Sequence, residues 1–520
     1  MEVLFQEPVT VVEVAAPPQM AEWRPFRSKR CRTFLLLSVL TLLGVLIAGY
    51  HPGAEDDGVY LAAIQHNLNP RLFRVDADFF ALKLQATVFD TWMADLIRIT
   101  HIPISAMVLL WHLLTIFAIL AACHRIASRC FKRESTCWCG VALVSVFFTL
   151  PITGTGLYII DQTLVPRAIA TALVLFAVDY VLARKYFAAC VLLVLSFLFH
   201  PVIAAFGCSL CFFLAVPWPL TGGFQMPVMV GAIVPVGWMF APVSPALRAA
   251  INLHGYCVLS RWLWYEWVGV VAPVFLLLWL ARSARRGAPT SKRKTLGHLA
   301  TRTAVYGIFQ LAVALLIMLP PALERMRPLE PMRYLHLLYV MMILLGGCLL
   351  GEHVLGEHPW RWAAFFLPAA IGMFLVQLSL FPSSPHLELP GIHSSDPWLQ
   401  AFTWVRNNTP EDAYFALGPD YLHRPGEDSH GFRALALRSA LADNWKDSGM
   451  VLTSSQLADR WQTEVTAQNA GHADWQHVSG EDLQRLKAQF GVNWVILERP
   501  TSVTLNCPYH NAALEVCRID

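Results

Sequence analysis

Three adjacent acidic residues, Glu55, Asp56 and Asp57, follow the first long apolar run of the chain, residues 34–50. Like charges this close raise one another's pKa, so such a run persists only where it is solvated, paired with cations or used in chemistry. Carboxylates at the exit of a membrane span can act as a general base or bind a divalent cation. A solvated acidic loop at a helix end is the alternative explanation.

The composition places this acidic run in a membrane protein. The 520 residues are 56% hydrophobic and only 14% charged, and the mean hydropathy is +0.48. These values are far from those of ordinary water-soluble domains. The net charge of +3 is too small to indicate a nucleic-acid partner. We therefore expect membrane lipids, and no nucleic acid, around the protein.

Basic residues before the first apolar run set the expected orientation. The positive-inside rule predicts a cytoplasmic tail over residues 1–33 and an acidic run outside the cell, in the cytoplasmic (inner) membrane. No cleavage site of small residues follows the run, so residues 34–50 are expected to remain as a signal anchor. The basic residues are Arg24, Arg27, Lys29, Arg30 and Arg32.

Further apolar runs predict about eleven transmembrane helices within residues 34–384. The run 187–216 is too long for one span and is expected to break at His200-Pro201. That division places an even number of spans before the basic cluster at 282–294, as a cytoplasmic cluster requires. The expected spans are 34–50, 102–122, 137–152, 164–182, two within 187–216, 227–241, 264–280, 303–319, 332–350 and 362–381.

Two extracytoplasmic parts are expected to accompany these spans. Residues 51–101 form a first outer loop whose apolar periodicity predicts short amphipathic helices on the membrane surface. Residues 385–520 are polar and predict one soluble α/β domain. Its expected elements are a capped helix from Ser479 to residue 490 and strands at 413–417, 494–498 and 514–519. In an oxidising compartment, Cys507 and Cys517 can form a disulfide, and two free thiols are the alternative.

Other polar residues near the expected outer ends of spans are candidate substrate contacts. Asp161 lies in the second outer loop, on the same side as the acidic run. Arg167 and Arg333 can bind phosphate bidentately or, alternatively, reach lipid headgroups. His200 can contact substrate or serve as a structural histidine at the helix break. Glu266 can line an acceptor groove or face interfacial water.

The polar tail contains four more candidates within fourteen residues, namely Asp420, Asp428, His430 and Arg433. They can bind an acceptor or form a salt-bridged loop. The sequence has no Gly-rich nucleotide loop, no zinc-spaced Cys/His set and no nucleophile elbow. These observations weigh against an ATP-driven pump and a serine hydrolase.

An acidic first outer loop, an acid in the second and a soluble outer tail together resemble the GT-C class of membrane glycosyltransferases, which use polyprenyl-phosphate-linked sugars. The resemblance covers nearly the whole chain in layout. More narrowly, four short motifs are similar to an uncharacterised bacterial family of GT-C-like proteins: Glu55-Asp56-Asp57-Gly58-Val59-Tyr60, residues 261–267, Pro331-Met332-Arg333 and residues 426–433.

The resemblance implies that an aspartate of the first outer loop acts as general base or metal ligand, with Asp161 as the second acidic position. We expect Asp57 or Asp56 to be the base. Glu55, Asp56 and Asp161 form a tentative site for Mg²⁺ or Mn²⁺, provided that Gly53 and Gly58 allow an irregular backbone. The expected substrate-binding residues are Arg333, Arg167, Asp161 and His200.

The expected activity is transfer of a sugar from a polyprenyl-phosphate carrier to a glycan, lipid or protein acceptor in the cell envelope. Two other classes remain open. A transporter or flippase would carry a lipid or polysaccharide, and is expected to have charges at mid-membrane and repeat symmetry. A non-catalytic assembly protein would bind a partner through its periplasmic domain.

The topology yields a direct prediction. A cysteine introduced at residue 290 should react with a membrane-impermeant maleimide only after the cell is opened, because the positive-inside rule places this loop in the cytoplasm. A cysteine at residue 425 should react in intact cells. The measurement is labelling before and after permeabilisation, and the reverse pattern would overturn the outward placement of the acidic loop.

Overall fold

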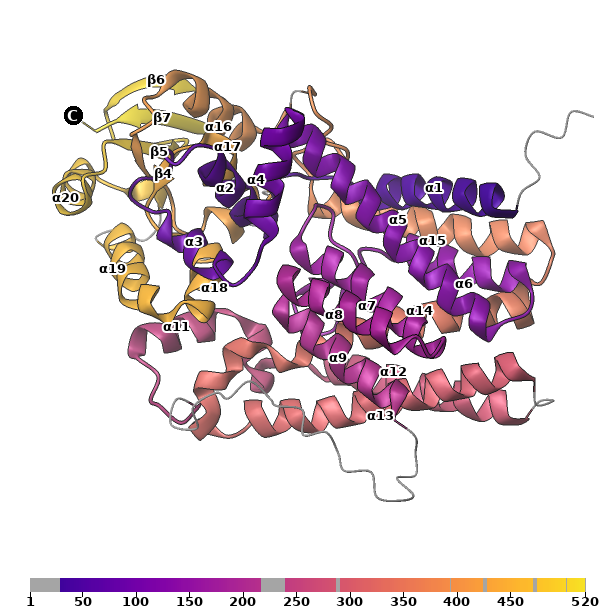
Figure 1. Ribbon diagram of the computed structural model, residues 1–520. Helices are drawn as coiled ribbons and strands as arrows, with labels where there is room; N and C mark the ends of the chain where they lie inside the picture. The colour runs from indigo at the N-terminus through magenta and orange to yellow at the C-terminus, as the bar shows by residue number, and fades with distance from the viewer. Residues whose placement is uncertain are drawn as a thin grey trace, which may run out of the picture.

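Helices make up most of the described chain in the computed structural model (Figure 1). The structure describes residues 29–216, 239–286, 290–392, 394–423, 428–470, 475–501 and 503–519. Within this part, six helical segments are long and apolar enough to cross a membrane: α1 (Lys29–Ala48), α5 (Ile104–Cys130), α12 (Trp264–Arg286), α13 (Ser291–Met318), Pro331–Leu355 around α14 (Leu335–Leu350), and α15 (Pro359–Leu380).

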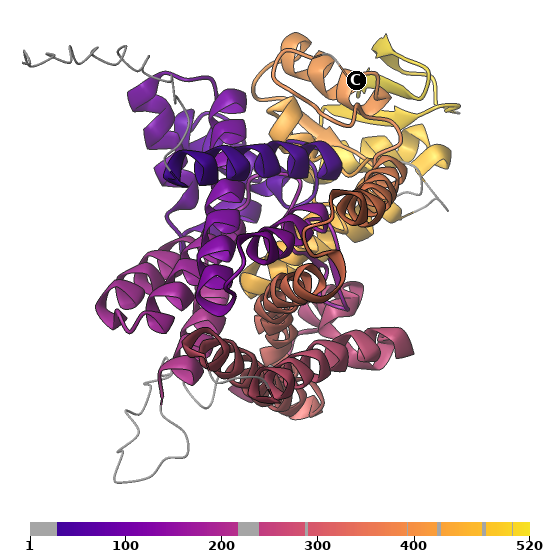
Figure 2. The same ribbon diagram turned by 90° about the vertical axis from the view of Figure 1, so that its right-hand side faces the viewer.

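Several of these helices leave apolar side chains uncovered. Phe275 of α12 is 69% exposed and Leu367 of α15 is 60% exposed. Surfaces of this kind need lipid around them, because water would penalise such an extended apolar area. Helices α1 and α15 also pack side by side although the chain separates them widely (Figure 1 and Figure 2). The bundle therefore has the character of a helical membrane protein.

The expected count of about eleven spans is not confirmed. The other apolar runs form shorter helices: α6 (Glu134–Val146), α7 (Pro166–Leu182), α8 (Tyr186–Phe199) and α9 (Pro201–Ala215). A helix of fourteen residues is about 21 Å long, which is less than a hydrocarbon core of about 30 Å. The break at His200-Pro201 is present, since α9 begins at the proline.

Parts of the sequence expectations fall outside the described residues. These are most of the expected span 227–241, Arg24 and Arg27 of the N-terminal tail, and residues 425–427 near the tail motif.

Glycines allow a close contact between helices α6 and α14. A Cβ atom on Gly140 of α6 would lie 2.5 Å from Cys348 Sγ of α14, and one on Gly347 would lie 2.9 Å from the Cα atom of Gly140. Small residues permit this approach of two helix backbones, as is typical of helices packed within membranes. Neither position has room for a larger side chain.

The first outer loop contains the expected short helices. Tyr60 and Ile64 of α2, Phe80 of α3 and Met93 of α4 pack with Val108 of α5 in one buried cluster. The loop is thereby fixed to the bundle, and its placement on a membrane surface stays a prediction. The helices are α2 (Asp57–Leu68), α3 (Asp78–Leu84) and α4 (Phe89–Thr100).

The C-terminal region contains a five-stranded sheet in the order β4-β3-β5-β7-β6, at one end of the molecule (Figure 1). Strand β3 is parallel to β4 and β5, whereas β7 is antiparallel to β5 and β6. The strands are β3 (Tyr414–Ala416), β4 (Ser439–Ala440), β5 (Trp494–Glu498), β6 (Asn506–His510) and β7 (Leu514–Arg518). A two-stranded ribbon, β1 (Pro151–Ile152) with β2 (Leu157–Tyr158), lies apart from it.

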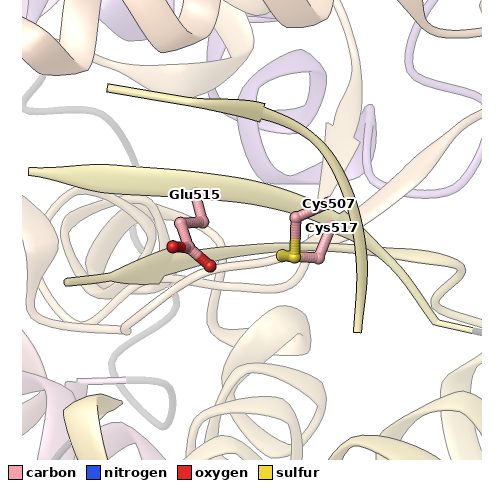
Figure 3. A group of neighbouring side chains, drawn as sticks. All are labelled: Cys507, Glu515 and Cys517. Atoms are coloured by element: carbon pink, nitrogen blue, oxygen red, sulfur yellow. A yellow bond between two sulfur atoms is a disulfide. The ribbon is translucent and has the colours of Figure 1, made fainter. Parts of the chain in front are cut away.

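Helices and a disulfide complete this region. Cys507 and Cys517 form a disulfide between β6 and β7, and Glu515 lies two residues before Cys517 on β7 (Figure 3). Helix α20 begins at the expected capping box of Ser479 and Asp482. The helices are α16 (Pro397–Asn408), α17 (Phe432–Ala436), α18 (Lys446–Thr453), α19 (Ala458–Asn469) and α20 (Gly480–Phe490).

The C-terminal region shares its core with earlier parts of the chain. Phe79 of α3 and Ile251 of α11 (Pro245–Leu253) pack with Val451 and Trp461 of the C-terminal region. Arg433 also reaches across, because its guanidinium bonds both Asp76 of the first outer loop and Asp447 of α18. The C-terminal region therefore packs against the first outer loop through apolar and charged contacts.

Asp179 of α7 provides a test of the bundle's polar anchors. Its carboxylate is fully buried and accepts hydrogen bonds from Arg125, at 2.8 Å, and from Arg129. Replacing it by Ala leaves two arginines without their partner, and we expect a loss of about 3 kcal/mol in unfolding free energy. The measurement is denaturant unfolding in detergent.

Asp95 provides a matched control for this loss. It is 64% exposed and pairs with Arg98 on the same helix, so D95N is expected to cost no more than about 1 kcal/mol. Equal stabilities of D179A and D95N would contradict the anchoring role of Asp179.

Candidate functional site

A cavity of about 790 Å³ opens where the helical bundle, the first outer loop and the C-terminal region meet. Cavities of this size hold small-molecule ligands in many proteins. Its wall combines apolar and aromatic groups with charged side chains from five separate parts of the sequence. The charged residues that line it include Asp56, Asp161, Arg167, Arg333 and Lys446.

Arg167 joins two acidic residues from separate loops. It stands at the start of α7, where Pro166 begins the helix. Its Nη1 donates to Asp56 Oδ2 at 2.5 Å, while Nη2 and Nε donate to the two oxygens of Asp161 at 2.6 and 2.8 Å. The Asp161 contact is bidentate, which fixes both side chains in one plane. Three residues that the sequence analysis singled out are thus in direct contact.

Lys446 of α18 extends this group into an ion network of five residues: Glu55, Asp56, Asp161, Arg167 and Lys446. Its ammonium donates to Glu55 Oε2 at 2.6 Å and to Asp56 Oδ1 at 3.1 Å. Burial alone would lower the pKa of Lys446, but Asp56 and Glu55 raise it above its ordinary value. The ammonium therefore stays charged at neutral pH, and the ion network carries one net negative charge.

The members of the ion network differ in their access to solvent. The side chains of Asp161, Arg167 and Lys446 are only 10–13% exposed, whereas that of Asp56 is 35% exposed. The enclosed members require partners because unpaired buried charge is costly. Asp56 can therefore keep its contacts within the ion network and also reach a molecule in the cavity.

Asp57 lies in a different environment from Asp56. Its side chain is buried, is not part of the cavity wall, and accepts the backbone N–H of Gly53 at 2.8 Å. Burial raises the pKa of Asp57 to about 7; the Gly53 hydrogen bond opposes the rise, and Asp161 and Asp56 add to it. Of the two residues expected to act as the base, the geometry favours Asp56.

The loop that carries these acids has the irregular backbone that its glycines suggested. Gly53 has φ = +83° and Glu55 has φ = +52°, a left-handed conformation that is uncommon for a residue with a side chain. Backbone contacts with the C-terminal region hold it: Glu55 N–H donates to Ser429 O, and Gly431 N–H donates to Gly53 O, both at 2.9 Å. The conformation is thus maintained by tertiary contacts.

Three other candidates line the same cavity. Arg333 pairs with Glu330 at 2.6 Å and lies over the ring of Tyr256. His200 caps α9, where its Nδ1 accepts the N–H of Ile203 at 3.3 Å. Glu266 accepts the N–H of Leu263 at 2.7 Å at the start of α12. His200 and Glu266 thus have local structural roles as well as a position at the cavity wall.

The tentative metal site of Glu55, Asp56 and Asp161 does not suit this geometry. Among the described residues, the groups whose potential ligand atoms all lie within 4.8 Å of one another do not include these three. The cationic side chains of Arg167 and Lys446 already occupy the space beside the carboxylates. A cation there would be repelled by both, so the arrangement favours ion pairing over metal binding.

The four tail candidates do not form one site. Asp420 accepts a hydrogen bond from Asn444 at 2.8 Å, and Arg433 is engaged with Asp76 and Asp447. Asp428 and His430 lie in a separate buried cluster near residues 388 and 396. Arg433 pairs with residues outside this group, so the four residues do not form one salt-bridged loop either.

Lys446 is the site residue that sequence reasoning missed. It lies 390 positions from Asp56 in an unremarkable polar segment, and no local pattern connects the two. A cation opposite three adjacent acids could be anticipated from charge balance, but its position could not.

No protein-family model matches this chain, and no curated protein matches it significantly. The functional interpretation therefore depends on the membrane helices, the cavity and the ion network.

The raised pKa of Asp57 predicts a pH-dependent stability. The folded protein holds this proton up to about pH 7, whereas the unfolded chain releases it near pH 3.8. Wild-type stability should therefore fall relative to D57N as the pH rises from about 4 to 7, by a total on the order of 4 kcal/mol. The measurement is the unfolding free energy of both proteins across this range. The unfolding free energy of D95N, at an exposed site, should change with pH as that of the wild type does. A difference between wild type and D57N that stays constant across the pH range would contradict the raised pKa of Asp57.

Proposed function

We propose that the protein is a membrane glycosyltransferase that moves a sugar from a polyprenyl-phosphate carrier to an acceptor at the outer face of the cytoplasmic membrane. One observation carries the proposal: Asp56 and Asp161, from separate loops, meet on Arg167 at a cavity beside apolar helices. This arrangement supplies a carboxylate for the acceptor proton and cations for a phosphate.

The cavity wall suits a substrate that is half lipid and half polar. Trp262 and Tyr265 line it close to the start of α12, a helix apolar enough to cross a membrane. The neighbouring Trp264 is 77% exposed, as expected for an aromatic residue at a membrane–water boundary. A polyprenyl chain can then remain among lipids while its phosphate and sugar occupy the charged cavity.

The chemistry is a single displacement at the anomeric carbon. The acceptor oxygen bonds to that carbon, its proton passes to Asp56, and the bond from the carbon to the phosphate oxygen breaks with its electron pair on the phosphate. Lys446 and Arg333 stabilise the negative charge on the leaving phosphate. Guanidinium and ammonium groups stabilise such charge strongly where the site is enclosed. A single displacement inverts the anomeric configuration.

The ion network also suggests how Asp56 gains basicity. In the structure its two oxygens are held by Arg167 and Lys446, and two cations make a carboxylate a weak base. A lipid phosphate in the cavity competes for Lys446, and loss of that contact frees one oxygen of Asp56. Donor binding would in this way prepare the base that the acceptor needs.

Substitution of Asp56 tests this proposal. D56N retains the shape of the side chain but cannot accept the proton, so we expect transfer to fall about 100- to 10,000-fold. D57N is expected to lose less, because Asp57 is buried outside the cavity wall. The measurement is release of radiolabelled sugar from a panel of polyprenyl-phosphate sugars by protein in liposomes, with water or added glycans as acceptor.

Controls separate the possible explanations. D95N alters an exposed residue and should retain full activity. Full activity of D56N would reject the role assigned to Asp56, provided that the wild type is active. Movement of a labelled lipid across the bilayer without release of sugar would instead identify a transporter.

A further inference from the structure

A second polar cluster lies close to the acidic loop, outside the cavity wall. It consists of Asp396, Asp428 and His430, whose potential ligand atoms all lie within 4.8 Å of one another. All three residues are at least 95% buried. Three ionisable groups in such an enclosed position require a specific arrangement of partners.

The proton on His430 can be placed from its neighbour. His430 Nε2 lies 3.0 Å from Glu388 Oε1, which also contacts His51 Nδ1 at 2.8 Å. A carboxylate oxygen accepts, so Nε2 of His430 must carry the proton. In the neutral imidazole, the lone pair is then on Nδ1, which faces Asp396 and Asp428.

Two side-chain atoms of this cluster have no hydrogen-bond partner among the described residues. They are His430 Nδ1 and Asp428 Oδ2, both buried. The remaining oxygens have assigned contacts. Asp428 Oδ1 accepts Ser383 N–H, Asp396 Oδ1 accepts Trp398 N–H, and Asp396 Oδ2 accepts a long hydrogen bond of 3.4 Å from the Ser384 hydroxyl. His430 Nδ1 and Asp396 Oδ2 are 4.0 Å apart, which is too far for a hydrogen bond. Two ligands of a tetrahedral Zn²⁺ lie about 3.4 Å apart, so binding one ion would draw these two side chains slightly together.

We propose that Asp396, Asp428 and His430 bind one divalent transition-metal ion, with Zn²⁺ as the preferred ion. One imidazole nitrogen with two carboxylates suits Zn²⁺ better than Mg²⁺ or Ca²⁺, which prefer oxygen ligands alone. Glu388 accepts a hydrogen bond from the proton-bearing nitrogen of His430 and so orients the imidazole, an arrangement common around metal-bound histidine. The ion supplies the positive charge that two buried aspartates need.

The position of this site gives the ion a structural task. Asp396 caps the start of α16, and His430 lies between Ser429 and Gly431, whose backbones bond to Glu55 and Gly53. An ion here joins α16 to the segment that holds the acidic loop. Metal binding therefore stabilises the fold and the position of Asp56, and contributes no atom to the transfer reaction.

The test is metal binding by the full chain, purified without a histidine tag. After removal of metal with a chelator, Zn²⁺ is titrated against a chromophoric competitor, with Mg²⁺ in parallel. We expect one Zn²⁺ per wild-type chain. D428N retains side-chain volume and the acceptor for Ser383, and should weaken binding at least about a hundredfold, as should H430Q. E388Q should weaken it about 10- to 100-fold through lost orientation.

His423 provides the matched control, because it is an exposed histidine of the same region. H423Q should bind Zn²⁺ like the wild type. At free Zn²⁺ a hundredfold above the wild-type Kd, the unfolding equilibrium constant should fall about a hundredfold for wild type and H423Q, and no more than about twofold for D428N. Absence of Zn²⁺ binding by the wild type, preference for Mg²⁺, or unchanged binding by D428N would each overturn the proposal. In that case His430 is an imidazolium held among three carboxylates.

Discussion

The pairing of Arg167 with Asp56 and Asp161 is the interaction on which the arrangement of this protein depends. A guanidinium that is almost enclosed by protein is unfavourable unless carboxylates surround it. One of its partners precedes α2 and the other precedes α7. The first outer loop must therefore reach the second for Arg167 to be buried. The cavity forms at this meeting point.

The same requirement extends to the C-terminal region. After Arg167 neutralises part of the acidic charge, Glu55 and the second oxygen of Asp56 still need a cation, and Lys446 of α18 supplies it. Backbone bonds from Ser429 and Gly431 hold the loop in its left-handed turn. The C-terminal region is thus part of the site, which explains why its core also includes side chains of α3 and α11.

Local patterns in the sequence predict the elements whose stability is local. The capping box of α20 and the helix break before Pro201 depend on nearby residues, and both are present. Strands β5 and β7 also lie where their apolar patterns predict them, although β5 pairs with the distant strand β3. Features that have no local pattern are not predicted. The expected count of about eleven spans is not confirmed, because apolar composition does not set the length of a helix. Helix α8, for example, contains only fourteen residues. Lys446 was missed because only the fold brings it to Asp56.

The acidic run also shows how three adjacent carboxylates can coexist. Successive side chains leave the backbone in different directions, so the residues reach different surroundings. Glu55 is half exposed and paired with Lys446, Asp56 lies between two cations, and Asp57 is buried with its pKa raised to about 7. A partly protonated Asp57 repels Asp56 less than an ionised one would. The repulsion that the sequence implies is therefore relieved separately at each residue. Glu55 and Asp56 both line the cavity, and Asp56 is the one that also contacts Arg167, beside Asp161. Its position, more than the number of acids, makes it the group suited to accept a proton.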